Sequence, residues 1–238
     1  MKTITEKFAE YFKEVIYGGI DGIVTTFAVV AGFAGASLGN TEATQLSFLI
    51  VLLFGLANLF ADAASMGLGN FLSVRSEKDL YNAVRAKEEV VLNQEDRGKR
   101  VTTTIRLMQE KGFSPEDAAT LSTLYQKNNE YWLDFLMLNE QDMPDPRGEN
   151  EVFTGLATFI SFMIFGAVPL LPFILQESGD PKTAFVYSSV GTLGALILLG
   201  IMKWRVIGSK FTASLFEVVA VGGTAAVLAY FVGTFFAV

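Results

Sequence analysis

Five long apolar segments dominate the hydropathy pattern of this chain. They run approximately over residues 15–38, 46–74, 152–175, 184–202 and 211–238. Each has about the 20 residues that a helix needs to cross the hydrocarbon core of a bilayer. We therefore predict an all-α, polytopic membrane protein with five transmembrane helices, two within residues 15–74 and three within residues 151–238.

A polar segment interrupts this pattern between the second and third apolar segments. Residues 75–150 hold most of the charged side chains, and residues 77–95 contain neither Gly nor Pro. Farther on, Ser114 followed by Pro115 and two acids is typical of a helix start, because Ser caps the first free N–H groups. We predict a small helical bundle as an insert over residues 75–150.

The first 14 residues are predicted to form a short amphipathic helix at the membrane interface. Phe8, Tyr11 and Phe12 alternate there with charged side chains, a pattern typical of helices that lie in the interface plane.

The positions of the basic residues predict the orientation of the chain. Of the 18 lysines and arginines, all but Lys182 lie in residues 1–14, in residues 75–150, or between the fourth and fifth apolar segments. Basic residues gather on the cytoplasmic side of membranes. We expect the N-terminus and the insert in the cytoplasm and the C-terminus on the opposite side of a bacterial inner membrane or a vacuolar-type membrane.

The amino-acid composition excludes several classes of catalysis, metal site and partner. The chain has no Cys and no His, so nucleophilic catalysis with these side chains and thiolate or imidazole metal sites are excluded. The net charge of −7 argues against a nucleic-acid partner. We expect no enzyme and no permanently bound cofactor, and any metal ion would take oxygen or thioether ligands.

Three acids lie inside the apolar segments, where an ionisable side chain is costly and marks a functional candidate. These are Asp21, Asp62 and Glu217. Asn58 and Met66 lie one helical turn before and after Asp62, so the three share one face. Carboxylate, amide and thioether together suit a transition metal. The alternatives are that Met66 only packs and that Glu217 lies at headgroup level.

Acids also recur at helical spacing in the insert. Most exposed acids on helices only keep a protein soluble, but a stripe that includes Met is also a candidate metal site. The stripes comprise Glu88 with Glu95, Glu89 with Asp96, and Glu130, Asp134, Met137 and Glu140.

Four motifs resemble the vacuolar iron transporter family and keep its order along the chain. They are YGGIDGIVTTFAVVAGFAGAS, ADAASMGLGNFLSVRSEKDLY, WLDFLMLNE and FGAVPLLPFIL. The resemblance implies five spans, a homodimer with the transport path at its interface, and a cytoplasmic helical domain that binds metal. It also implies proton-coupled export of Fe²⁺, sometimes Mn²⁺, from the cytosol.

The resemblance matches five residues of this chain to positions of the family's motifs. Asp21 matches the aspartate of the family's first span, and Met66 matches the methionine of its second span. In the insert, Met137 and Glu140 match the methionine and glutamate that follow WLDF, and Glu89 matches a glutamate of the first cytoplasmic helix.

Within the spans, this chain departs from the family at two positions. Asn58 stands where the family commonly has a glutamate, and Asp62 fills a position that is usually small, as if the acid had moved by one turn.

In the insert, Arg100 and Thr103 stand at apparent ligand positions, and Leu136 replaces a methionine. Two interpretations follow. Either the insert is structural, with Arg100 and Arg106 paired with Glu88, Glu89 or Glu95, or it keeps a reduced site of Glu89, Met137 and Glu140.

These features predict a divalent transition-metal transporter that moves Fe²⁺ or Mn²⁺ out of the cytosol, with Glu217 or Asp62 as proton carrier. One alternative is a membrane metal sensor or assembly protein that transports nothing. Another is a transporter of an organic cation, lined by four aromatic residues. The candidate metal ligands are Asp21, Asn58, Asp62, Met66, Glu88, Glu89, Met137 and Glu140, and the four aromatic residues are Phe27, Phe33, Phe54 and Phe60.

Overall fold

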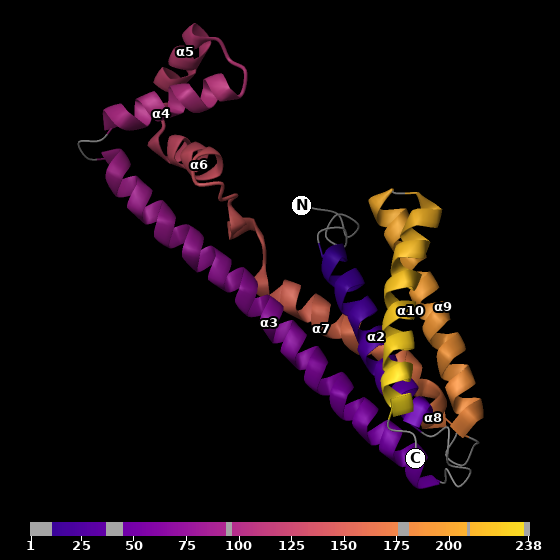
Figure 1. Ribbon diagram of the computed structural model, residues 1–238. Coiled ribbons are helices and arrows are strands. Elements are labelled where there is room, and N and C mark those ends of the chain that lie inside the picture. Colours follow the sequence, from indigo (N-terminus) through magenta and orange to yellow (C-terminus); the bar gives the residue numbers. More distant parts are fainter. Residues whose placement is uncertain (1–10, 37–44, 94–96, 176–180, 209, 236–238) are drawn as a thin grey trace. The chain divides into compact units, whose positions relative to one another are not determined.

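The structure is a computed structural model that describes residues 11–36, 45–93, 97–175, 181–208 and 210–235. The described residues form α-helices and two short 3₁₀ turns, with no strand among them, as predicted. The helices are α2 (Phe12–Ala36), α3 (Gln45–Asn93), α4 (Arg97–Glu110), α5 (Pro115–Tyr125), α6 (Asn129–Asn139), α7 (Glu151–Ala167), α8 (Leu171–Leu175), α9 (Pro181–Ile207) and α10 (Phe211–Phe235), and the turns are η2 (Pro146–Gly148) and η3 (Val168–Leu170) (Figure 1).

Five helical segments of the described chain are long and apolar enough to cross a membrane. They correspond to the five apolar segments of the sequence. The second continues without a break into the polar insert, so that α3 has 49 residues. The third is divided at η3, because Pro169 cannot donate a backbone hydrogen bond to the preceding turn. The predicted amphipathic helix over residues 1–14 lies largely outside the described residues, although Phe12–Glu14 begin α2.

The chain divides into two compact units. One comprises Met1–Phe71 with Val152–Val238, and the other comprises Leu72–Glu151. We call the first the membrane unit and the second the insert. Helix α3 contributes its first part to the membrane unit and its second part to the insert.

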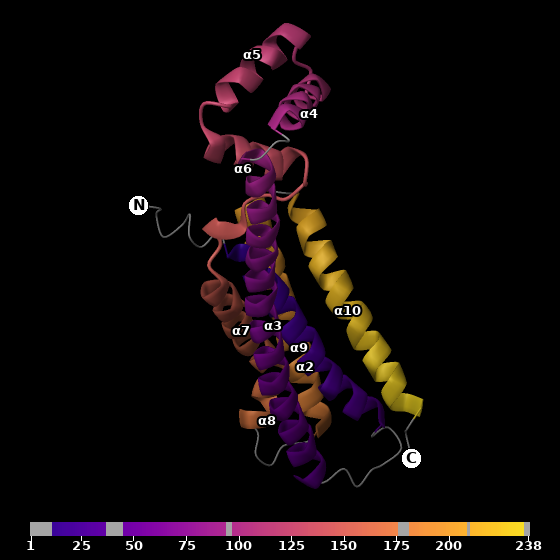
Figure 2. The same cartoon turned by 90° about the vertical axis from the view of Figure 1, so that its left-hand side faces the viewer.

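Close helix contacts hold the membrane unit together. Helices α2, α9 and α10 pack against one another, and in Figure 2 α10 stands at the right-hand side of the group. Gly18 and Gly22 bring α2 against the backbone of α7, where Thr158 and Phe162 lie. Small residues at such crossings let two helix backbones approach in a bilayer, where packing replaces the hydrophobic effect between helices.

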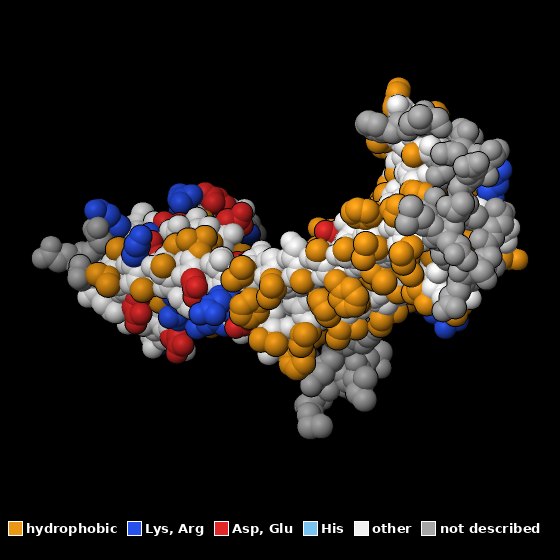
Figure 3. Space-filling view, turned by 90° about the horizontal axis from the view of Figure 1, so that it is seen from below, with side chains coloured by type: hydrophobic (Ala, Val, Ile, Leu, Met, Phe, Trp, Pro, Cys, Tyr) orange, Lys and Arg blue, Asp and Glu red, His pale blue; other side chains and the backbone are white. Residues whose placement is uncertain are grey.

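The surface of the membrane unit is strongly apolar. Phe54 on α3 and Phe216, Phe231 and Phe235 on α10 all have more than half of their side chains exposed. Figure 3 shows hydrophobic side chains gathered over one part of the surface and charged side chains over another. A water-soluble domain rarely exposes so much contiguous apolar area, whereas a membrane protein presents it to lipid tails.

The insert has its own small core. Trp132 of α6 lies at its centre, fully buried, and its Nε1–H donates to the Thr104 hydroxyl of α4 at 2.7 Å. Leu92 of α3 and Leu107 of α4 belong to the same cluster. The predicted start of α5 is confirmed, because Ser114 accepts a hydrogen bond from the Asp117 N–H at 3.1 Å.

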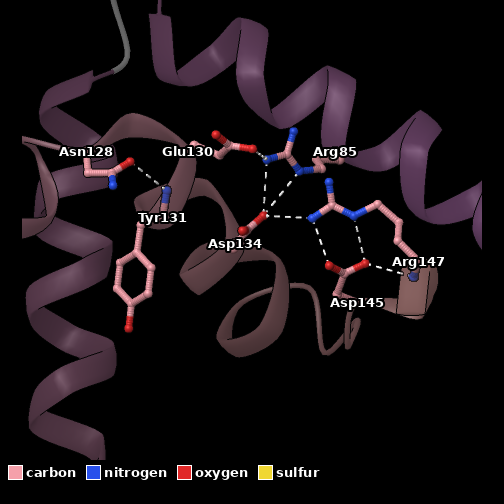
Figure 4. Close-up of polar contacts among 7 residues, drawn as sticks. All are labelled: Arg85, Asn128, Glu130, Tyr131, Asp134, Asp145 and Arg147. Atoms are coloured by element: carbon pink, nitrogen blue, oxygen red, sulfur yellow. Dashed lines mark hydrogen bonds and ion pairs between the residues drawn. The ribbon is translucent and has the colours of Figure 1, made fainter. Parts of the chain in front are cut away.

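Ion pairs attach the end of the insert to its helices. Arg85 of α3 contacts Asp134 of α6 at 3.1 Å, and Arg147 of η2 contacts the same carboxylate at 3.6 Å (Figure 4). Arg147 also forms a two-pronged pair with Asp145 at 2.8 Å. These contacts join α3, α6 and η2.

Candidate metal sites

Two acids of the membrane unit lie close enough for their charges to interact. They are Asp21 of α2 and Asp62 of α3, both half-buried. Residues 41 positions apart in the sequence thus supply carboxylates to one region of the membrane unit. Like charges repel in a medium of low polarity, so a cation between or beside them is stabilised.

A second polar side chain lies one turn from Asp62 on the same face of α3. Asn58 donates its side-chain N–H to Asp62 Oδ2 at 2.8 Å. Met66, one turn later, is half-buried and packs against the core cluster that contains Leu59 and Phe162. The amide, carboxylate and thioether therefore follow one another on a single helix face, as the spacing predicted.

Two polar residues of the membrane unit did not figure among the candidates from sequence. Asn70 continues the α3 face by one more turn and donates to the Thr158 hydroxyl of α7 at 2.7 Å. Glu14 is only 3% exposed, and its Oε2 has no hydrogen-bond partner among the described residues. Glu14 lies seven residues before Asp21, a spacing that places both on one face of α2 and offers a signal in the sequence.

Glu217 lies in a different environment from the other two acids. It is exposed on α10 and forms an ion pair with Lys203 of α9. Nearby, Trp204 of α9 packs edge-on against Phe211 at the start of α10. Aromatic and basic side chains of this kind are typical of a membrane interface.

In the insert, Arg100 of α4 lies between two of the candidate ligands. Its guanidinium contacts Glu88 of α3 at 2.7 Å and both carboxylate oxygens of Glu140 at 2.7 and 2.8 Å. Gln141 donates to the other oxygen of Glu88 at 3.2 Å. The ion pair between Arg100 and Glu88 was one of those anticipated from sequence, whereas Arg106 pairs with Glu110 on its own helix.

The other two insert candidates lie in different settings. Met137 is fully buried in the insert core, and Glu89 is exposed on α3. Among the described residues, no group of three or more acids is arranged to hold a metal ion.

The four aromatic residues considered as a lining for an organic cation do not share one environment. Phe27 is buried and stacks on Phe185 of α9, with ring centroids 6.1 Å apart. Phe33 is half-buried, whereas Phe54 and Phe60 are exposed on α3.

Long apolar helices with a lipid-type surface, together with half-buried acids on two of them, define an integral membrane protein. Comparison with known proteins identifies the family to which it belongs. The family model of the VIT family matches residues 12–234, and the chain belongs to this family.

The relatives agree with the family assignment predicted from the motifs. The vacuolar iron transporter of Toxoplasma gondii is 34% identical over 242 residues, which cover 97% of this chain and 76% of the relative. Vacuolar iron transporter 1 of Arabidopsis thaliana is 32% identical over 223 residues, covering 93% of this chain and 84% of the relative. Vacuolar iron transporter 1 of Oryza sativa subsp. japonica is 31% identical over 224 residues, with coverage of 93% and 83%.

Proposed function

We propose that this protein transports a divalent transition metal, Fe²⁺ or Mn²⁺, out of the cytosol. The observation that carries the proposal is that two half-buried carboxylates, Asp21 of α2 and Asp62 of α3, lie near enough to influence each other electrostatically inside the membrane unit. Its membership of the VIT family, whose relatives are named iron transporters, supports the same function.

The ligands proposed for the ion come from α2 and α3. Asp21 and Asp62 supply negative charge, Asn58 supplies an amide oxygen, and Met66 supplies a thioether that favours Fe²⁺ over Mg²⁺ or Ca²⁺. The hydrogen bond from Asn58 orients the Asp62 carboxylate before an ion arrives. The buried carboxylate of Glu14, on the same face of α2 as Asp21, is added as a further candidate on the path.

Topology, assembly and coupling complete the proposal. The N-terminus and insert lie in the cytosol and the C-terminus on the far side, as the distribution of basic residues favours. A second copy of the chain covers part of the exposed apolar surface, so that the protein is a homodimer. Asp62 is the favoured carrier of the counter-proton over Glu217, because Glu217 is already engaged by Lys203.

The test is metal flux into proteoliposomes that hold the purified protein. Uptake of Fe²⁺ and Mn²⁺ is followed with a trapped metal-sensitive dye, with and without an imposed pH gradient. We expect the pH gradient to accelerate metal uptake by the parent. Uptake by Asp62→Asn should no longer respond to the gradient. Absence of metal flux alongside metal binding by the protein would favour a non-transporting sensor instead. Flux or thermal stabilisation by organic cations only would favour the organic-cation alternative.

A further inference from the structure

The acidic centre of the insert already contains a cation that belongs to the chain. Glu88 of α3 and Glu140 at the end of α6 are brought together by the Arg100 guanidinium of α4. The three side chains are only 16%, 12% and 23% exposed for Arg100, Glu88 and Glu140. All three side chains lie within the insert.

Each of the four carboxylate oxygens lies against a side-chain N–H donor or the guanidinium charge, and Glu88 Oε2 is engaged by the ion pair without a hydrogen bond. Both oxygens of Glu140 accept from Arg100, one oxygen of Glu88 faces the guanidinium, and the other accepts from Gln141. An arginine keeps its charge at every physiological pH, so it cannot yield this place by losing a proton. A divalent ion entering here would add two positive charges at contact distance from the guanidinium.

The position of Arg100 is itself well supported. The backbone carbonyl of Arg100 accepts from the Thr104 hydroxyl at 2.8 Å, and that hydroxyl accepts from buried Trp132. One turn earlier, Arg97 stacks over the Trp132 ring at 5.2 Å. Helix α4 is therefore held against α6 in the register that directs Arg100 to the two carboxylates.

We propose that Arg100 is a resident cation of the insert: it holds α3, α4 and α6 together and keeps divalent metal ions from Glu88 and Glu140. The insert then assembles without metal, and ions reach the membrane unit without being stored at these carboxylates. The inference deepens the proposed function, and its meaning for transport rests on that function. Its test uses metal binding, which is read without any transport.

Replacement of the guanidinium by a neutral amide is the decisive change. In Arg100→Gln the two carboxylates lose their cation, and carboxylate with amide oxygens is a ligand set that suits Mn²⁺. We expect full-length R100Q in detergent to gain a saturable Mn²⁺ site, detected by loss of the free-Mn²⁺ EPR signal. Adding Glu140→Gln to R100Q should weaken this new site by about tenfold or more, since it loses a charged ligand.

Two matched variants separate the site from general charge effects. Arg106→Gln removes the same charge from an exposed pair on the same helix and should gain no site. Arg100→Lys keeps a cation and should also gain none. The thermal midpoint of R100Q should fall below that of the parent and rise with Mn²⁺, whereas Mn²⁺ should not produce this rescue in R106Q.

The outcomes are separable from those of the transport test. Single Glu88→Gln or Glu140→Gln changes in the parent should leave Mn²⁺ binding unaltered. A parent whose Mn²⁺ binding falls in either variant, or an R100Q protein that gains no site, overturns the role of Arg100. Failure of the parent to transport any metal overturns the proposed function. The Mn²⁺ binding of R100Q can still be interpreted in that case. If R100Q does not fold, the two glutamate variants still decide the question.

Discussion

At the scale of single residues, the hydrogen bond from Asn58 to Asp62 explains how an amide serves in an acidic site. The bond spans one helical turn at 2.8 Å, a spacing that an α-helix provides without distortion. An amide donor beside a carboxylate reduces its rotational freedom and orients the oxygen that it does not contact. In the proposed site, Asn58 would therefore position Asp62 as well as offer an oxygen.

Asn58→Leu is the change that tests this role. Without the amide, Asp62 loses its orientation and the ion loses a ligand, so we expect the metal concentration for half-maximal flux to rise by about tenfold. Asn58→Asp restores an oxygen ligand and should recover much of the affinity. Equal half-saturation values in the parent and in Asn58→Leu would remove Asn58 from the site.

The sequence predicted which candidate residues share a helix face better than it predicted their contacts. Helical spacing alone placed Asn58, Asp62 and Met66 on one face. It could not show that Glu140 is held by Arg100, because that contact joins positions 40 residues apart across two helices. It also assigned Glu14 to an interfacial helix, since burial depends on neighbours that the local sequence does not name.

At the scale of helices, glycines set how closely α2 approaches α7. A Cβ added to Gly18 would lie 2.6 Å from the Thr158 carbonyl oxygen, and one added to Gly22 would lie 2.5 Å from that of Phe162. Both neighbours are backbone atoms that cannot turn away. The position of Asp21, between these two glycines, therefore depends on a crossing that only glycine permits.

Gly18→Ala and Gly22→Ala should each lower the free energy of unfolding by about 1–3 kcal/mol, the usual cost of overpacking. Thermal unfolding in detergent is the measurement. Gly194→Ala on α9 is the matched control, because nothing lies within 4 Å of its added Cβ and alanine favours the helix. A loss of stability in Gly194→Ala as large as in Gly22→Ala would contradict this account of the crossing.

Stability of the insert is expected to depend on pH through the turn η2. Hydrogen bonds from the Arg147 side chain lower the pKa of Asp145 below its usual value. A lowered pKa contributes stability that is present above the unfolded value, about 3.9, and is lost as pH falls through the folded value. The effect is modest, since the Asp145 side chain is 45% exposed.

We expect the thermal midpoint of the parent to fall more steeply than that of Asp145→Asn between about pH 4 and pH 2. Asp79→Asn, at an exposed position of α3, serves as the control and should follow the parent. Parallel pH curves for the parent and Asp145→Asn would show that the pair with Arg147 adds nothing to stability.

At the scale of the whole molecule, the hydropathy pattern predicted the helices well because a membrane leaves few alternatives. An apolar segment of about 20 residues must satisfy its backbone internally, and a helix does so. The pattern could not show where α3 stops being part of the membrane unit, because the helix continues unbroken from Gln45 to Asn93. The hydropathy pattern does not mark the division of the third segment at η3, but Pro169 in the sequence does.

The central claim is that Asp21 and Met66 contribute to a metal path through the membrane unit. The most direct measurement is Fe²⁺ and Mn²⁺ flux into proteoliposomes by the parent, Asp21→Asn and Met66→Ala, at matched amounts of folded protein. Met66→Leu keeps the volume and removes only the thioether, which separates ligation from packing. We predict at least about a tenfold loss of flux for Asp21→Asn and Met66→Ala, and a loss for Met66→Leu that is larger for Fe²⁺ than for Mn²⁺. Parental flux in both Asp21→Asn and Met66→Ala would contradict the account.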